Sequence, residues 1–421
     1  MDFENTCAER LIRYARFDTQ SDRFSQEHPT TRKQFDLARE LKRELENMGA
    51  SDVSLDEEYC VLYARIPSNL PVGQGLAFGL ITHMDTSPDA CSRDISPRRI
   101  HYEGGAVELS PGILMTPDEF PNLLQYVGQD LIVTDGKTLL GGDDKASIAS
   151  VVTLAEHLLA HPEIPHPDVC LAFTPDEEVG GLARDLDFHR LGARIAYTLD
   201  GDHLGYWEDE TFNASEATIR IAGRSVHPGT AKGIMINACD IAARFISMLP
   251  ENEKPQSTDG REGFYHVVSC EATCESAKVS LIIRDHDAGQ FALREQRIRD
   301  MAEELCRIYG AGRVTAEIQP SYRNMKEVID KVPFMIQDLT QAIRDSGIEP
   351  HSIAFRGGTD GSSLSHRGLP CPNLSAGYEN AHGRFEYVPV PSMAGNVRIL
   401  IHLCRLLSER STADIAGLPP I

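Results

Sequence analysis

The sequence lacks a long hydrophobic run and is poor in basic residues. Nowhere in its 421 residues is there a stretch of about 18 consecutive apolar residues, which a membrane-spanning helix requires. Lys and Arg number 41 against 63 Asp and Glu, so the formal net charge is −22. Binding to a phosphate backbone depends on clustered basic residues and is therefore disfavoured. We expect neither a membrane protein nor a nucleic-acid-binding protein.

The sequence also lacks a secretion signal and a disulfide pattern. Its N-terminal segment, MDFENTCAERLIRYARF, carries acidic residues where a signal peptide carries a basic region. The ten cysteines are scattered and lie mostly inside apolar runs, as reduced thiols of a protein core do. The close pair Cys270 and Cys274 has no second pair to complete a zinc site. These features predict a cytoplasmic protein.

Motifs of several other enzyme classes are missing or incomplete. No G-x-S-x-G segment is present, which counts against a serine hydrolase of the common α/β type. His157 and His161 are spaced like a helical zinc pair, but Leu158 replaces the glutamate of H-E-x-x-H. Gly136-Lys137-Thr138 resembles the end of a phosphate-binding loop, yet Leu131 stands where the first glycine is required. We interpret these segments as structural.

The hydrophobic pattern predicts an α/β fold with a mostly parallel sheet and helices on both faces, because strands and helices alternate. Apolar runs of strand length occupy residues 60–66, 76–82, 169–174 and 195–199. Helical periodicity begins near Phe3 and recurs over residues 31–48, with Gly49 as a stop signal, and again after Asp144. The pattern resumes after residue 321, with helices over 328–345 and 392–407 and strands over 352–355 and 372–376.

The order changes between residues 212 and 320. This segment predicts strand 217–221, helix 237–249, strands 265–270 and 279–284, helix 288–308 and strand 314–318. The order β-α-β-β-α-β is that of a ferredoxin-like domain. We therefore expect two domains, one formed by residues 1–211 and 321–421 and the other inserted as residues 212–320.

Five segments place acidic residues or histidine directly after predicted strands or at the start of a helix. They are LITHMDTSPDA with His83 and Asp85, LLGGDDKAS with Asp143 and Asp144, FTPDEEVGG with Glu177 and Glu178, YTLDGD with Asp200 and Asp202, and AGYENAHGRFE with His382. In an open parallel sheet, ligands gather at the carboxyl ends of the strands, so these segments should converge on one crevice.

A cluster of two histidines and several carboxylates suits a divalent metal, and mixed nitrogen and oxygen ligation is typical of catalytic zinc. Without a metal, such packing of like charges would cost several kcal/mol. Any one segment alone is better explained by a helix cap or a turn. Five such segments together favour a zinc site.

Taken together, these segments resemble the peptidase T family of tripeptide aminopeptidases, within the larger group of dinuclear zinc peptidases and deacylases that includes carboxypeptidase G. The similarity runs nearly end to end and includes SVHPGTAKGIMINA, EGFYHV, LIIRDHD and FRGGTDGSSLSHRGLPCPNL. The resemblance implies two Zn²⁺ ions per subunit, with Co²⁺ or Mn²⁺ as substitutes, and removal of the N-terminal residue from short peptides. It also implies that the inserted domain is a lid or a domain through which a homodimer forms.

The resemblance assigns roles to individual residues. It gives His83 and Asp200 to the first zinc, Glu178 and His382 to the second, and Asp143 to both. It makes Glu177 the general base for a metal-activated water, and Asp85 the acid that orients the His83 ring.

Four further residues lie in or near the inserted domain. By the resemblance, His227 stabilises the oxyanion, although a turn histidine before Pro228 is the alternative. Arg284, Asn237 and Arg356 are candidates for the substrate carboxylate. For Arg284, the alternative is a sheet-edge ion pair with Asp285 or Asp287.

Two departures from the family pattern concern the substrate rim. Where the family usually reads HG-x-HE from the last metal histidine, this chain has His382-Gly383-Arg384-Phe385-Glu386. Asp202 and His203 also stand where small residues are usual in the family. A carboxypeptidase or N-acyl amino acid deacylase would share every metal ligand, and the TAKG and RGGTDG segments argue against it. A non-catalytic binding protein is the other alternative, but Glu177 and Asp143 are both retained.

Overall fold

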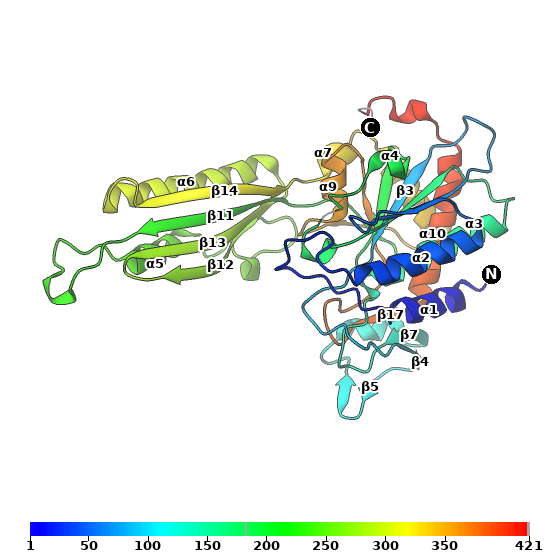
Figure 1. Ribbon diagram of the computed structural model, residues 1–421, viewed down its shortest axis with the longest axis horizontal. Coiled ribbons are helices and arrows are strands. Elements are labelled where there is room, and N and C mark those ends of the chain that lie inside the picture. Colours follow the sequence, from blue (N-terminus) through cyan, green and yellow to red (C-terminus); the bar gives the residue numbers. More distant parts are fainter. Residues whose placement is uncertain (182, 419–421) are drawn as a thin grey trace. The chain divides into compact units, whose positions relative to one another are not determined.

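The computed structural model describes residues 1–181 and 183–418 and divides the chain into two units (Figure 1). Unit 1 comprises Met1–Asp209, Met325–Ile353 and Thr359–Ile421, and unit 2 comprises Glu210–Asn324 and Ala354–Gly358. The short segment Ala354–Gly358 belongs to unit 2 because its backbone pairs there: the Phe355 N–H donates to Glu210 O at 2.9 Å, and the Phe212 N–H donates to Gly357 O at 3.2 Å.

Unit 1 is built on an eight-stranded sheet. In spatial order its strands are β1 (Ser51–Leu55), β2 (Leu62–Ile66), β8 (Val169–Thr174), β3 (Phe78–His83), β9 (Ala196–Leu199), β16 (Asn373–Leu374), β10 (Tyr206–Glu210) and β15 (His351–Ala354). The central strands β8, β3, β9 and β16 run parallel, whereas β1 and β2, β2 and β8, and β10 and β16 pair antiparallel. The α/β prediction is confirmed, and the sheet is mixed, with its antiparallel pairs toward the edges.

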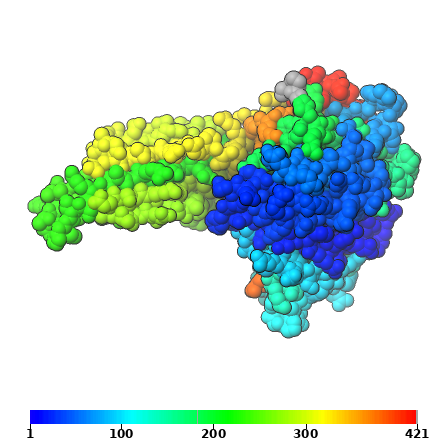
Figure 2. Space-filling view, in the orientation of Figure 1, coloured from blue at the N-terminus to red at the C-terminus, as the bar shows by residue number. Residues whose placement is uncertain are grey.

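Helices cover both faces of this sheet, as the alternation of side chains along β8 requires. Val169, Leu171 and Phe173 join the larger hydrophobic core, and Cys170 and Ala172 join a smaller core on the opposite face. The larger core is closed by α1 (Phe3–Tyr14), α2 (Gln34–Met48), α3 (Gly142–Ala160), α8 (Phe334–Asp345) and α10 (Val390–Ser408). The smaller core includes residues of α4 (Phe188–Leu191) and α9 (Asp360–His366), and α7 (Lys326–Ile329) contacts α9. The N-terminal segment, coloured blue, forms much of the unit 1 surface in Figure 2.

A smaller sheet in unit 1 was not expected from the sequence. It consists of β17 (Tyr387–Pro389), β7 (Gln129–Val133) and β4 (Arg98–Tyr102), all antiparallel, beside a hairpin of β5 (Val107–Ser110) and β6 (Ile113–Met115). A separate apolar cluster that includes Tyr102, Leu131 and Tyr387 holds these strands together. Strand β17 follows the His382 segment directly, so this sheet anchors one end of that segment.

Unit 2 has the predicted β-α-β-β-α-β order. Its elements are β11 (Asn213–Ala222), α5 (Ala238–Met248), β12 (Phe264–Ala272), β13 (Ser276–Asp285), α6 (Ala288–Tyr309) and β14 (Val314–Tyr322). The strands lie in the order β12, β13, β11, β14 and pair antiparallel throughout, which is the ferredoxin-like arrangement. Phe245 of α5 and Leu305 of α6 pack with Ile219, Val279 and Leu281 of the sheet in the core of this unit.

Local chemistry explains two element boundaries that differ from the predicted ones. Helix α2 begins at Gln34 instead of residue 31, because the Thr31 hydroxyl donates to Gln20 O at 2.7 Å in the preceding turn. Strand β2 begins at Leu62 instead of residue 60, because Cys60 adopts a left-handed φ of 60°. Within the part of the chain that the structure describes, no helix has the length and apolar character needed to cross a membrane.

Candidate active site

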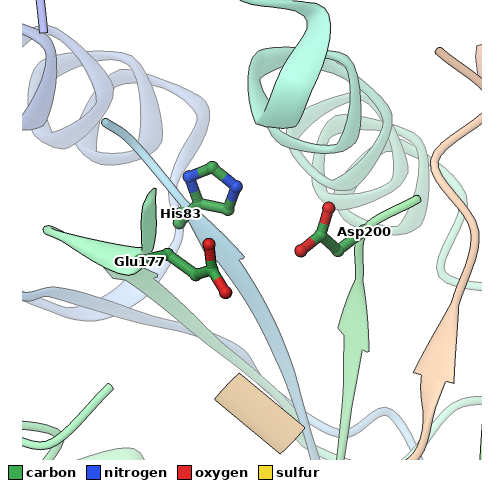
Figure 3. Close-up of side chains that lie close together, drawn as sticks. All are labelled: His83, Glu177 and Asp200. Carbon is green, nitrogen blue, oxygen red and sulfur yellow. The ribbon is translucent and has the colours of Figure 1, made fainter. Parts of the chain in front are cut away.

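Acidic residues and histidine gather where the central parallel strands of unit 1 end. His83 is the last residue of β3, Glu177 and Glu178 begin a short 3-10 turn after β8, and Asp200 follows β9. Figure 3 shows the side chains of His83, Glu177 and Asp200 directed toward one another from these three positions. One donor atom from each of these three side chains lies within 4.8 Å of the others, and the same holds for His83, Asp143 and Glu178.

Asp143 lies between the two expected histidine ligands. Its Oδ1 is 2.9 Å from His83 Nε2, and its Oδ2 is 3.3 Å from His382 Nε2. His382 Nε2 also lies 2.8 Å from Glu178 Oε2. His83, Asp143, His382 and Glu178 therefore form one continuous chain of contacts, although they are distant in the sequence. The His382 side chain is 45% exposed, so this end of the cluster is open to solvent.

Asp85 connects His83 to the turn that carries the two glutamates. Its side chain is fully buried, and its Oδ1 lies 3.3 Å from His83 Nδ1. The same carboxylate accepts hydrogen bonds from the Glu177 N–H at 3.0 Å and the Glu178 N–H at 3.2 Å. Asp85 thus contacts Nδ1 of His83 and, at the same time, the backbone of the turn that carries Glu177 and Glu178.

Burial and mutual repulsion disfavour the negative charges of this cluster. Burial, with the nearby Asp143 carboxylate, raises the pKa of Glu178 to about 8 and that of Asp200 to about 6. Burial also raises the pKa of Glu177 well above its usual value. Contacts with Asp143 and Glu178 raise the pKa of His382 to about 11.

The donor set fits divalent metal ions. It combines imidazole nitrogens with carboxylate oxygens, the mixture that catalytic zinc sites use. Glu178 Oε1 is buried and has no hydrogen-bond partner, so one lone-pair direction is left for a cation. Distances alone do not separate the roles of Glu177 and Glu178, since each shares a compact donor group with His83.

Three supporting residues were missed by the sequence analysis. The Tyr378 hydroxyl donates to Asp200 Oδ1 and accepts from the Gly201 N–H at 2.8 Å. Asp360, at the start of α9, is buried and accepts a hydrogen bond from the Thr174 hydroxyl at the end of β8. Burial, and the neighbouring Asp200 and Asp85, raise the pKa of Asp360 to about 7, even though His83 acts in the opposite sense. The Glu386 carboxylate accepts hydrogen bonds from the backbone N–H groups of Leu140, Gly141 and Asp143.

The residues of the predicted substrate rim lie beside this cluster in unit 1. His203 Nδ1 is 2.6 Å from Glu379 Oε1, and the Tyr126 hydroxyl donates to the same oxygen. Phe385 packs against Phe120 with ring centroids 5.0 Å apart. His203 and Phe385 are thus held in place by contacts within unit 1.

The other predicted site residues belong to unit 2. His227 is exposed, and its Nδ1 accepts a hydrogen bond from the Gly229 N–H at 3.1 Å, the contact of a turn histidine. Asn237 caps α5 through the Cys239 N–H at 3.0 Å. The contacts of both residues within unit 2 are those of ordinary structural residues, a turn for His227 and a helix cap for Asn237.

The two predicted arginines make local contacts. Arg284 donates to Ile283 O at 3.0 Å and lies over the Tyr322 ring, whereas Asp285 pairs with Arg294 at 2.6 Å. Arg356 donates to the carbonyls of Gly260 and Glu262, each at 2.9 Å, and lies near the Phe212 and Phe264 rings. Asp285 is therefore engaged by another arginine, and the guanidinium of Arg356 is already largely occupied.

Comparison of the sequence with known proteins adds two relationships. A family model described as a peptidase dimerisation domain matches residues 210–310. A peptidase T of Geobacillus kaustophilus is 44% identical over 410 residues, which cover 96% of this chain and 98% of that protein.

Two solved structures share the fold. An aminopeptidase PepT from Bacillus cereus superposes with a TM-score of 0.75 at 21% identity, covering 96% of this chain and 98% of that one. A dinuclear metal-binding peptidase of the M20 family from Bacillus subtilis superposes with a TM-score of 0.65 at 14% identity, covering 96% of this chain and 99% of that one.

Proposed function

The chain belongs to the peptidase T family and is a peptidase, and we propose that it is a dinuclear zinc aminopeptidase that removes the N-terminal residue from tripeptides. The observation that carries this proposal is the position of Asp143 between His83 and His382, 2.9 and 3.3 Å from the two rings. A carboxylate that offers one oxygen to each of two histidine-containing donor groups is suited to bridge two ions.

In this proposal, His83 and Asp200 hold one Zn²⁺, Glu178 and His382 hold the other, and Asp143 contacts both. Co²⁺ or Mn²⁺ can replace zinc. When bound, the pair of ions supplies acidification of a water and polarisation of the scissile carbonyl. Asp85 orients the His83 ring through Nδ1, because metal-binding imidazoles usually present their second nitrogen to a carboxylate.

Glu177 serves as the general base. A base must remain free of strong ligation and must hold a proton during the reaction. The Glu177 carboxylate would take a proton from the attacking water and return it to the leaving amine, because it faces His83 and Asp200, which would hold the first ion. The hydrogen bond from its backbone N–H to Asp85 fixes the turn that presents it.

Unit 2 contributes recognition and assembly in this proposal. His227 stabilises the oxyanion, and Arg284, Asn237 and Arg356 are the candidates for the C-terminal carboxylate of the substrate, since a guanidinium can bind a carboxylate through two hydrogen bonds. The match to a peptidase dimerisation domain over residues 210–310 supports a homodimer formed through this unit. A cytoplasmic location is supported by the ten cysteines, all free.

A substrate panel tests this function. Zinc-loaded protein should be assayed with dipeptides, tripeptides, tetrapeptides, N-acetylated tripeptides and N-acetyl amino acids. An aminopeptidase of this kind releases the N-terminal residue from tripeptides and leaves the acetylated compounds intact. Release of the C-terminal residue, or cleavage of N-acetyl amino acids alone, would instead indicate a carboxypeptidase or a deacylase.

A further inference from the structure

Glu386 binds the backbone of the turn that begins α3. Its Oε2 accepts hydrogen bonds from the Leu140 N–H at 2.7 Å and the Gly141 N–H at 2.8 Å, and its Oε1 accepts one from the Asp143 N–H at 2.9 Å. The residue is 2% exposed. Leu140 and Gly141 precede α3, and Asp143 and Asp144 at its start have non-helical backbone torsions, so these N–H groups lie in an irregular turn. Buried N–H groups need an acceptor, and the Glu386 carboxylate supplies one to all three and in turn fixes them.

This cap is unusual because of where it comes from. The residue at the N-cap position, Gly141, has no side chain, and the acceptor is instead 243 positions away from Asp143 in the sequence. A Ser, Thr, Asn or Asp at the N-cap would accept from an N–H two or three residues further on and would leave the Leu140 and Gly141 N–H groups without an acceptor. A distant acceptor does something that a local one cannot, since it joins two separate segments of the chain.

The two joined segments both carry predicted metal ligands. One segment contains Asp143, and the other contains His382, four residues before Glu386. The contact is also closely packed: a Cβ atom on Gly142 would lie 2.5 Å from Val388 Cγ2 and 3.0 Å from Glu386 Oε1. Movement of the Glu386 segment therefore displaces the backbone that presents Asp143.

We propose that Glu386 is a positioning residue of the metal centre, which fixes Asp143 and His382 at the separation at which both contact the same ion. This inference rests on the proposed metal centre and adds to it a residue that touches neither the metals nor the substrate. Replacing Glu386 should lower the affinity for metal by more than a general loss of stability explains.

The test is a titration of metal-free protein with Co²⁺, followed by visible absorption and calorimetry. In Glu386→Gln the side chain keeps one acceptor oxygen, so either the Asp143 N–H or the Leu140 and Gly141 N–H groups face an NH₂ group. Loss of a residue that orients metal ligands typically lowers metal affinity about 10- to 100-fold, and we expect a decrease in this range with an altered Co²⁺ spectrum.

Asp338→Asn is the matched control. Asp338 is a 5% exposed acid of α8 that accepts hydrogen bonds from Arg410 at 2.6 and 2.9 Å. This variant also loses interactions of a buried carboxylate and should lose thermal stability, but its Co²⁺ affinity should stay at the wild-type value. A loss of affinity in Asp338→Asn as large as in Glu386→Gln would mean that general destabilisation explains both, and would overturn the proposal.

Glu386→Asp keeps the charge on a side chain one methylene shorter, and it replaces Glu386→Gln if that variant does not fold. We expect it, too, to bind Co²⁺ more weakly than wild type. Wild-type affinity and spectrum in the folded Glu386 variant would refute the positioning role while leaving the metal centre intact. Failure of the wild-type protein to bind Co²⁺ would refute the metal centre and the positioning role together.

Discussion

Glu177 and Glu178 are adjacent in sequence but should respond oppositely to the same substitution. Both donate their backbone N–H to Asp85, at 3.0 and 3.2 Å, so replacing either with Gln leaves the turn and its anchoring unchanged. Their side chains differ, because Glu178 Oε2 lies 2.8 Å from His382 Nε2 whereas Glu177 faces His83 and Asp200. In the proposed mechanism, Glu177 is the base and Glu178 is a metal ligand.

Glu177→Gln should retain both metal ions and lose turnover. Removal of a general base typically lowers the rate about 10²- to 10⁴-fold, which corresponds to about 3–5 kcal/mol of activation free energy. Because the volume and the backbone contacts are preserved, the loss should appear in kcat, with KM nearly unchanged. Glu178→Gln removes a charged ligand. The variant protein should therefore bind fewer than two zinc ions at zinc concentrations that saturate the wild type.

Two measurements on each variant decide between the roles. Zinc content after gel filtration gives the stoichiometry, and steady-state hydrolysis of a tripeptide gives kcat and KM. One donor atom of Glu177 lies within 4.8 Å of donors from His83 and Asp200, so a ligand role is geometrically possible. A Glu177→Gln protein with only one zinc ion would establish that ligand role, and one with wild-type kcat would show that Glu177 is not the base.

Three further predictions concern metals, specificity and pH. Dialysis against a chelator should abolish activity and added zinc, cobalt or manganese should restore it, whereas full activity in metal-free protein would contradict a metal-dependent mechanism. Arg284→Ala should raise KM for tripeptides, because a substrate carboxylate left buried without its partner costs a few kcal/mol of binding free energy. The KM for C-terminally amidated tripeptides should rise much less, and an equal rise for both substrates would show that Arg284 is only a structural residue. Burial raises the pKa of Glu208 from 4.5 to about 8, so the folded state binds this proton more tightly and the unfolding free energy should fall as pH rises across this interval. In thermal melts of chelator-treated protein, the stability of Glu208→Gln should decrease less between pH 5 and pH 8 than the stability of the wild type. Equal decreases would show that Glu208 is not the group responsible.

The convergence of the acidic segments was predictable from the sequence. His83, Glu177 and Asp200 follow apolar runs that form β3, β8 and β9, and the carboxyl ends of parallel strands lie at one edge of a sheet. The same reasoning needs no knowledge of loop conformation, because only a few residues separate each side chain from its strand. The ferredoxin-like order of unit 2 was predictable for a similar reason, since its strands and helices are long and strongly periodic.

The supporting contacts of the site were not predictable in this way. Glu386, Tyr378 and Asp360 act on residues 243, 178 and 186 positions away, and no local pattern specifies such partners. Glu386 is also the last residue of the segment that contains His382, and no pattern in that segment gives it a role of its own. Only the packing of the His382 segment against α3 reveals what it does.

The small sheet of unit 1 was missed for a different reason. Strand β4 reads Arg-Arg-Ile-His-Tyr, with an alternation too polar to signal a buried strand, and β17 is three residues long and contains Pro389. These strands form because β7 supplies an apolar centre for both, through pairs such as Ile100 with Leu131 and Tyr387 with Val133. Such pairing depends on tertiary contacts between distant segments.

The central claim is that two metal ions share Asp143. Crystals of the zinc-loaded protein, measured with X-rays on either side of the zinc absorption edge, test this claim directly. We expect two anomalous peaks, one in contact with His83 and Asp200, the other in contact with Glu178 and His382, and both in contact with Asp143. A single peak, or a pair of peaks in which Asp143 contacts only one ion, would contradict it.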